Sequence, residues 1–265
     1  MRTPHILLLA ALTGMTGLTG CGGKSGKDVA RSDQDYLNAM EVGRDSFDLT
    51  HADQAKTQFE NAYGRALLRD DVLAIRDAGY NLAVAELAMG NASATLDTVH
   101  RVHADMALRG DVSSPALDLV AMAASCRLGE NAQAVALARG IRTDDPALLE
   151  RRAFLTGIAA DGLGDAGLLA SSLNAMPVSP RPPRLEQADR AELESRLALR
   201  QGRYDQAESQ AIAATNLRRD MLDYRGMARA LDIASSAAKA AGKDSQAAAY
   251  SERATQSRSN AGDKG

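Results

Sequence analysis

Aromatic side chains are nearly absent from this chain of 265 residues: they make up 3% of it, and there is no tryptophan. The interior therefore has to be filled by alanine, leucine and other small or aliphatic side chains. Runs that alternate apolar with polar residues, the usual sign of a half-buried strand, are also scarce. This composition favours closely packed helices over a β-sheet.

Cysteine and histidine are rare as well, with two and four residues in the whole chain. His100 and His103 would lie close together on one helix with Asp105 nearby, but no cysteine or further histidine completes a metal site. Cys126 has no free partner if Cys21 is modified, and it carries no companion motif of a nucleophile. It is therefore interpreted as a small core residue. No metal site, cofactor or catalytic residue is predicted.

The chain also lacks an excess of basic residues. Its net charge is −3 at pH 7 and its pI is near 5.8. Domains that bind nucleic acids usually present a strongly basic face, so no nucleic-acid partner is expected. The mixed charges indicate a solvated helical exterior instead.

What the chain does contain is a regular series of glycines, spaced by 39, 35, 38 and 40 residues. The series consists of Gly90, Gly129, Gly164, Gly202 and Gly242. Small or apolar residues follow each glycine at helical spacing, for example Ala207, Ala211 and Ala214 after Gly202. Glycine readily adopts the left-handed conformation that ends a helix, so each glycine is predicted to join two helices of a pair.

A sixth pair is expected upstream, without the glycine turn. Val42-Gly43 is followed by Ala55, Phe59 and Ala62, and this pattern resembles the tetratricopeptide repeat, which pairs Leu-Gly in its first helix with an Ala…Phe…Ala ladder in its second. The spacings exceed the family's usual length of about 34 residues, and no unit carries the family's tryptophan. The resemblance implies an all-α fold, a right-handed superhelical solenoid of about six helix pairs.

The N-terminus has the order of an export signal. A short apolar run, Ile6–Leu12, is too short to span a bilayer as a permanent helix. The following Leu18-Thr19-Gly20-Cys21 resembles the bacterial lipoprotein box, which implies that Cys21 becomes the lipid-modified first residue. An ordinary secretory signal with an incidental cysteine is the alternative. Because Gly22 rather than aspartate follows, the resemblance implies a lipid anchor in the outer membrane, facing the periplasm.

The chain is predicted to divide into a signal peptide and a series of helical segments. After residues 1–20, the glycine-rich residues 21–33 are a flexible tether, and residues 34–176 hold units one to four. Four prolines in residues 177–184 break the helices. Units five and six occupy residues 185–257, with helices expected at about 204–217 and 220–241. A disordered tail, residues 258–265, is expected to follow.

In tetratricopeptide repeats the first helices line a concave groove, so the resemblance suggests where a partner protein binds. The positions singled out for this groove are Tyr80, Leu87, Leu119 and Phe154. Aligning the glycine turns brings further residues to the same face, namely Met40, Arg44, Phe47, Val84, Ala123, Ile158, Glu192 and Arg196. Ordinary packing in the core is the competing interpretation of these residues.

The function that these features favour is a lipid-anchored, periplasm-facing scaffold for protein–protein interaction, which aids assembly of an envelope or secretion complex. Its expected partners are a protein of the cell envelope and the membrane itself, through the lipid on Cys21. A solute-binding or accessory subunit of a transporter is an alternative. A lipoprotein enzyme is a third reading, disfavoured because no catalytic constellation is found.

Overall fold

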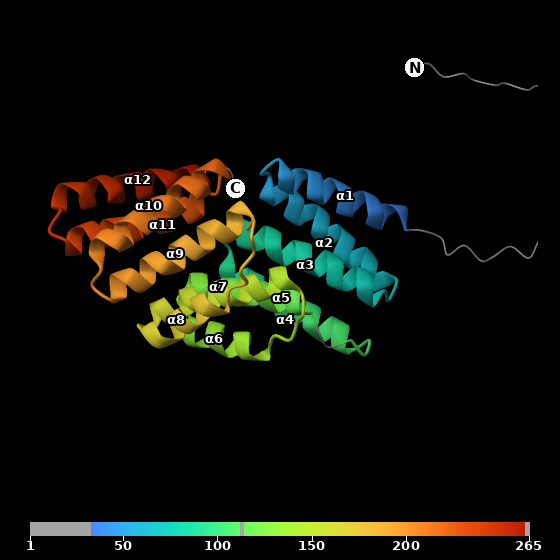
Figure 1. The fold of residues 1–265 in the computed structure, drawn as a ribbon. Coiled ribbons are helices and arrows are strands. Elements are labelled where there is room, and N and C mark those ends of the chain that lie inside the picture. Colours follow the sequence, from blue (N-terminus) through green and yellow to red (C-terminus); the bar gives the residue numbers. More distant parts are fainter. Residues whose placement is uncertain (1–32, 112–113, 263–265) are drawn as a thin grey trace, which may run out of the picture. The chain divides into compact units, whose positions relative to one another are not determined.

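The computed structural model describes residues 33–111 and 114–262, and the regular secondary structure within these ranges is entirely helical. Twelve helices follow one another there in one compact unit (Figure 1). They are α1 (Gln34–Asp48), α2 (Ala52–Leu68), α3 (Val72–Ala88), α4 (Ala92–Ala107), α5 (Pro115–Leu128), α6 (Asn131–Gly140), α7 (Pro146–Gly162), α8 (Ala166–Ala175), α9 (Arg184–Arg200), α10 (Tyr204–Asp220), α11 (Tyr224–Ala240) and α12 (Asp244–Gly262). The predicted signal peptide, Cys21 and the tether up to residue 32 lie outside the described residues.

The helices are arranged as six consecutive pairs. Each helix packs against the one that follows it, and α3, α5, α7, α9 and α11 also contact one another in succession. The first helices of pairs two to six therefore form a continuous layer. This arrangement is an all-α helical solenoid, as the repeat pattern predicts.

Each pair turns at one residue with a left-handed backbone. At the five predicted glycine turns φ lies between +73° and +87°, which confirms them. In the first pair Thr50 takes this place, with a φ of 65°. A β-branched residue is strained in this conformation because its Cβ crowds the backbone. The upstream unit thus has the same turn as the others, made by an unfavourable residue.

The connection between α10 and α11 differs from the expectation. The sequence suggests a helix from about residue 220, but α10 continues to Asp220 and α11 begins only at Tyr224. Leu222 adopts a left-handed φ of 58°. The side chain of Asp223 then caps α11 by accepting a hydrogen bond from the backbone N–H of Gly226 at 2.8 Å. A capping aspartate therefore sets the start of α11.

Large apolar side chains fill the core of the first four pairs. They form two clusters, whose large buried members include Phe59, Ile75, Leu82, Met106, Leu117, Met122, Phe154, Leu169 and Met176. In the first pair Gly43 lies directly against Phe59: a Cβ at position 43 would be 2.6 Å from Cε1 of the ring. This close approach explains why glycine and phenylalanine occur together in this unit.

The core of the last two pairs is made mostly of alanine. Ala207, Ala211 and Ala214 are fully buried, as their spacing predicts, and they belong to three small clusters. Ser195 of α9 donates a hydrogen bond to the carbonyl of Ala207 at 2.6 Å. At the equivalent position in α11, Ser235 donates a hydrogen bond to the carbonyl of Ala247 at 2.8 Å. Hydrogen bonds thus join helices that have little apolar bulk between them.

The proline-rich segment interrupts the helices but not their packing. Beyond it, Arg190 of α9 donates hydrogen bonds back to the carbonyls of Met176 and Pro177, at 3.2 and 3.1 Å. Leu193 of α9 belongs to the second core cluster, together with Phe154 of α7. Pairs four and five are therefore packed together across this segment.

The end of the chain also differs from the expectation. Residues 258–262, predicted to be disordered, continue α12 to Gly262. Ser257 is buried, and Arg258 forms an ion pair with Asp232 of α11 at 2.8 Å. Because α12 extends to Gly262, the prediction of a disordered tail from residue 258 is wrong as far as residue 262.

Candidate functional site

Three hollows adjoin one another along the first helices of the pairs. We call them the N-terminal hollow, the central cavity and the C-terminal hollow, with volumes of about 230, 490 and 650 Å³. The first two share Phe47 and Val84, and the last two share Arg229. Because they share lining residues, they form one surface, which we call the inner face.

The central cavity combines apolar and basic side chains. Its apolar lining comes from α1, α3, α5, α7 and α9, and consists of Phe47, Val84, Leu87, Ala88, Ala123, Cys126, Phe154, Leu155, Ile158 and Leu185. Its charged lining consists of Arg127, Arg151, Arg218, Asp223, Arg225 and Arg229. Five of these six charged residues are arginines, so the cavity is basic although the whole chain is acidic.

Arg218 of α10 is the most deeply buried of these arginines, with 2% of its surface exposed. It pairs with Asp189 and, at 3.3 and 2.9 Å, with Glu192 and Asp223. Arg151 of α7 forms a second ion pair with Asp189 at 2.9 Å. A buried charge is tolerated only when it is paired, and here each arginine has carboxylate partners on a neighbouring helix.

Glu192 of α9 is the hub of this ion network. Its carboxylate is fully buried and accepts hydrogen bonds from Arg229 at 3.1 Å and from Arg196 at 3.0 Å. Burial alone would raise the pKa of Glu192, but the guanidinium groups of Arg229, Arg196 and Arg218 lower it to about 2. Glu192 is therefore ionised at neutral pH.

Glu150 of α7 shows the opposite behaviour at the edge of the same network. Burial, together with the negative charge of Asp189, raises the pKa of Glu150 to about 7. Burial also raises the pKa of Asp189, against the opposing effect of Arg151 and Arg218. The junction between α7 and α9 thus holds one carboxyl group that titrates near neutral pH.

The other two cavity arginines are not part of this network. Arg127 and Arg225 form no ion pair within the described residues, and Arg127 donates a hydrogen bond to the backbone carbonyl of Leu87. Burial, followed by the nearby charges of Arg225 and Arg229, lowers the pKa of Arg127 to about 10, and the charge of Asp223 opposes this shift. Burial also lowers the pKa of Arg225, while the charge of Asp223 opposes this shift. The cavity therefore holds two arginines that form no ion pair within the described residues.

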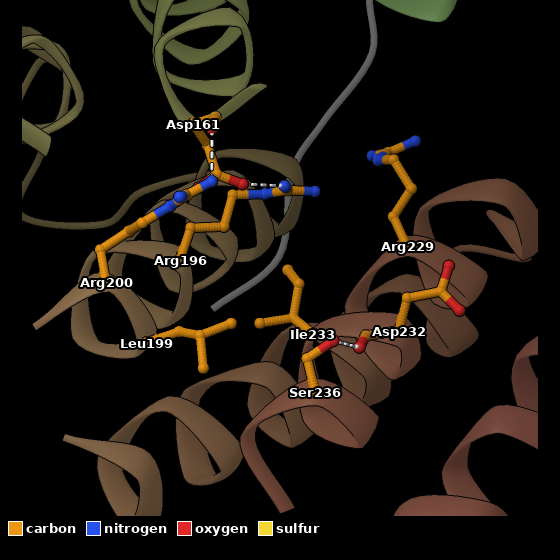
Figure 2. A pocket seen from close by; sticks show the side chains of 8 residues that line it. All are labelled: Asp161, Arg196, Leu199, Arg200, Arg229, Asp232, Ile233 and Ser236. Carbon is orange, nitrogen blue, oxygen red and sulfur yellow. Dashed lines mark hydrogen bonds and ion pairs between the residues drawn. The ribbon is translucent and has the colours of Figure 1, made fainter. Parts of the chain in front are cut away.

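The C-terminal hollow is mainly ionic. Figure 2 shows the side chains of Arg196 and Arg200 converging on Asp161, which each contacts at 2.7 Å. Across the hollow, Arg229 and Asp232 project from α11 (Figure 2). Each basic side chain here has an acidic partner, so this part of the inner face has little unpaired charge.

The structure brings together only some of the residues expected in a groove. Leu87 and Phe154 both line the central cavity, although Phe154 is also part of the core, with 3% of its surface exposed. Leu119 is buried in the second core cluster, so core packing takes the place of the surface role expected for it. Tyr80 is exposed but lines none of the three hollows.

The further positions found by aligning the glycine turns divide in the same way. Those that line the central cavity are Phe47, Val84, Ala123 and Ile158. Arg44 lines the N-terminal hollow and Arg196 the C-terminal hollow, whereas Met40 and Glu192 are buried. Six of these eight positions thus line one of the three hollows. The turn alignment did not find Arg127, Arg151, Arg218 and Arg225, because their convergence depends on packing between distant units.

The remaining candidates for chemistry have ordinary structural roles. Cys126 is half-buried in the cavity wall, and burial raises the pKa of its thiol to about 11, so the thiol is protonated at neutral pH. His103 contacts Asp118 at 2.8 Å. Within residues 33–111 and 114–262, no cluster of three or more metal-ligating side chains occurs, and no helix is long and apolar enough to cross a bilayer.

Comparison with known proteins identifies the fold. No protein-family model matches the chain, and no curated protein matches its sequence. A solved structure does match: the crystal structure of a tetratricopeptide repeat protein from Parabacteroides merdae ATCC 43184, with a TM-score of 0.52 and 15% identity. The match covers 88% of this chain and 94% of that one. The fold is thus similar to that of a tetratricopeptide repeat protein along most of its length.

Proposed function

We propose that this chain is a lipid-anchored scaffold that faces the periplasm and binds an envelope protein through its inner face. The observation that carries the proposal is the continuous inner face itself, on which three hollows adjoin. The tetratricopeptide-like fold supports binding over catalysis, because open helical repeats present extended surfaces for partner proteins. The lipoprotein-like Leu18-Thr19-Gly20-Cys21 supports the anchor and the export.

The test is site-specific photocrosslinking in intact cells. A photoreactive residue is placed on the inner face at Asn81, Leu185 or Ser236, and on second helices at Gln133 of α6 or Glu252 of α12. We expect the same protein adduct from all three inner-face positions and none from the two controls. Adducts from the control positions alone would reject the inner face as the binding surface.

The anchor is tested separately by Cys21→Ser. If Cys21 carries the lipid, this variant should lose membrane association on cell fractionation while retaining the melting temperature of the helical unit. A variant that still sediments with outer membranes would contradict the lipid anchor. The crosslinking result does not depend on this outcome.

A further inference from the structure

The central cavity presents two arginines without an ion pair, Arg127 and Arg225, beside an apolar surface. Its one aspartate, Asp223, is already engaged, because it accepts a hydrogen bond from Arg218 at 2.9 Å and caps α11 at Gly226. No other carboxylate from residues 33–111 or 114–262 lines the cavity. Among the described residues, Arg127 and Arg225 are therefore left without an ion pair.

Both arginines lie at the same cavity, and neither forms an ion pair within the described residues. They line the same cavity from α5 and α11, where Arg225 is half-buried and Arg127 is exposed. Arg229 lines this cavity too, and the charges of Arg225 and Arg229 lower the pKa of Arg127 while that of Asp223 opposes the shift. An oxyanion bound between Arg127 and Arg225 would offset this repulsion, and guanidinium groups bind oxyanions with strong, charge-assisted hydrogen bonds.

The rest of the lining does not suit a simple inorganic anion. Leu87, Phe154 and Ile158 contribute apolar surface, and a hydrated phosphate would leave this surface in contact with water. A purely apolar molecule would leave the two arginines unpaired. The volume of about 490 Å³ lies within the range of small-molecule sites, which are mostly apolar with a few placed polar groups.

We propose that the central cavity binds an amphipathic carboxylate of the fatty-acid class, with its carboxylate between Arg127 and Arg225 and its chain along Leu87, Phe154 and Ile158. This site goes beyond the proposed scaffold function and does not require it, because the ligand is a small molecule and not the partner protein. It is also the kind of ligand that a solute-binding accessory subunit would carry.

Calorimetric titration of the full-length chain tests this site. The Cys21→Ser chain is used, so that no acyl group of its own competes with the probe. The probes are acetate and two amphiphiles, decanoate and decyltrimethylammonium, each amphiphile being kept below its critical micelle concentration. We expect saturable binding of one decanoate, and binding at least about ten-fold weaker for the cationic amphiphile and for acetate. Equal binding of the anionic and cationic amphiphiles would overturn the proposal, as would the absence of saturable decanoate binding.

Single charge removals locate the head group. Arg127→Gln and Arg225→Gln should each weaken decanoate binding by about ten-fold or more. Arg181→Gln is the matched control, because this exposed arginine carries the same charge and does not line the cavity. Melting temperatures are measured first, so that a folding defect is not mistaken for lost binding, and the exposed Arg127 gives the safer variant.

A peptide arm separates this ligand from an acidic protein segment. If N-acetyl-Leu-Phe-Glu-amide binds in an Arg127-dependent way and decanoate does not, the amphiphile proposal is overturned in favour of a peptide. Unchanged decanoate affinity in both arginine variants also overturns it. None of these outcomes alters the photocrosslinking test of the scaffold, so the two proposals can fail independently.

Discussion

The first four helix pairs and the last two solve the same packing problem with different chemistry. In pairs one to four, side chains such as Phe59, Leu82 and Met122 fill two large apolar clusters. In pairs five and six the apolar clusters contain only a few buried residues each, mostly alanines. The last two pairs instead bury charged side chains, among them Asp189, Glu192 and Arg218.

The difference shows that a core of alanine supplies little of the buried apolar area on which folding depends. Small side chains let helix backbones approach closely but bury little apolar area, and burial of apolar area is the main driving force of folding. Hydrogen bonds and buried ion pairs bring specificity to such an interface, but their net contribution is modest because desolvation opposes it. We therefore expect the stability of pairs one to four to depend on the volume of their apolar side chains. The stability of pairs five and six should depend on each buried charged or polar group having its partner.

The largest effect should come from breaking the ion network. Arg218→Ala leaves three carboxylates with fewer partners in a buried site, which should destabilise the chain by about 3–5 kcal/mol. The melting temperature should fall by roughly 10 °C. The neighbouring Arg219→Ala is the control: it is exposed and should change stability by no more than about 0.5 kcal/mol. Equal, small effects of both variants would show that the network is not what holds these pairs.

A smaller effect is expected from overfilling the alanine core. Ala211→Leu adds volume at a fully buried position between α10 and α11 and should cost about 1–3 kcal/mol. Ala213→Leu makes the same change on the exposed side of α10 and should be nearly neutral. Thermal unfolding followed by circular dichroism measures both. A neutral Ala211→Leu would mean that these helices have room to separate.

The junction between the two regions should give a pH-dependent effect of about 1 kcal/mol. Glu150 has a pKa of about 7 in the folded chain against an ordinary value of 4.5. Its contribution therefore favours folding below pH 4.5 and is lost as the pH rises through 7. Glu150→Gln should melt above the unaltered chain at pH 8 and equally at pH 4.

Glu192 should make the stability depend on pH in the opposite direction. Its pKa is lowered to about 2, so its stabilising contribution is present above pH 4.5 and is lost as the pH falls towards 2. Glu192→Gln should therefore lower the melting temperature at pH 7. If both glutamine variants shift the melting curves in the same direction at pH 7–8, the assignment of opposite environments is wrong.

The smallest effect should be shared by both regions, because it concerns the backbone alone. Thr50→Gly and Leu222→Gly place glycine at left-handed positions and should each stabilise the chain by up to about 1 kcal/mol. Thr57→Gly, in the exposed part of α2, should instead lower the melting temperature. Unchanged melting of both left-handed variants would show that these turns store little strain.

The sequence predicts the repeat architecture well, because each turn and each ladder is specified locally. The glycine turns and the buried Ala207, Ala211 and Ala214 are of this kind. Thr50 shows the limit of such signals: its left-handed backbone is imposed by the two helices that it joins, and its residue type gives no hint of it.

The candidate site was less predictable, because it is made between units. Asp189 and Glu192 have the spacing of ordinary charges on an exposed helix face, and only packing against α7, α10 and α11 buries them. Glu208 looks like an exposed neighbour of the alanine ladder. In the structure it pairs with Lys243 at 3.0 Å and accepts a hydrogen bond from Tyr250 at 2.9 Å.

The central cavity has a mechanical consequence. Elsewhere in the described chain, the strongest contacts join helices that are neighbours or next neighbours in sequence, as is usual in repeat proteins. The cavity is the exception, because Phe47 of α1 and Arg225 of α11 both line it. A molecule bound there would contact both early and late helix pairs, so the solenoid could lengthen only after releasing it.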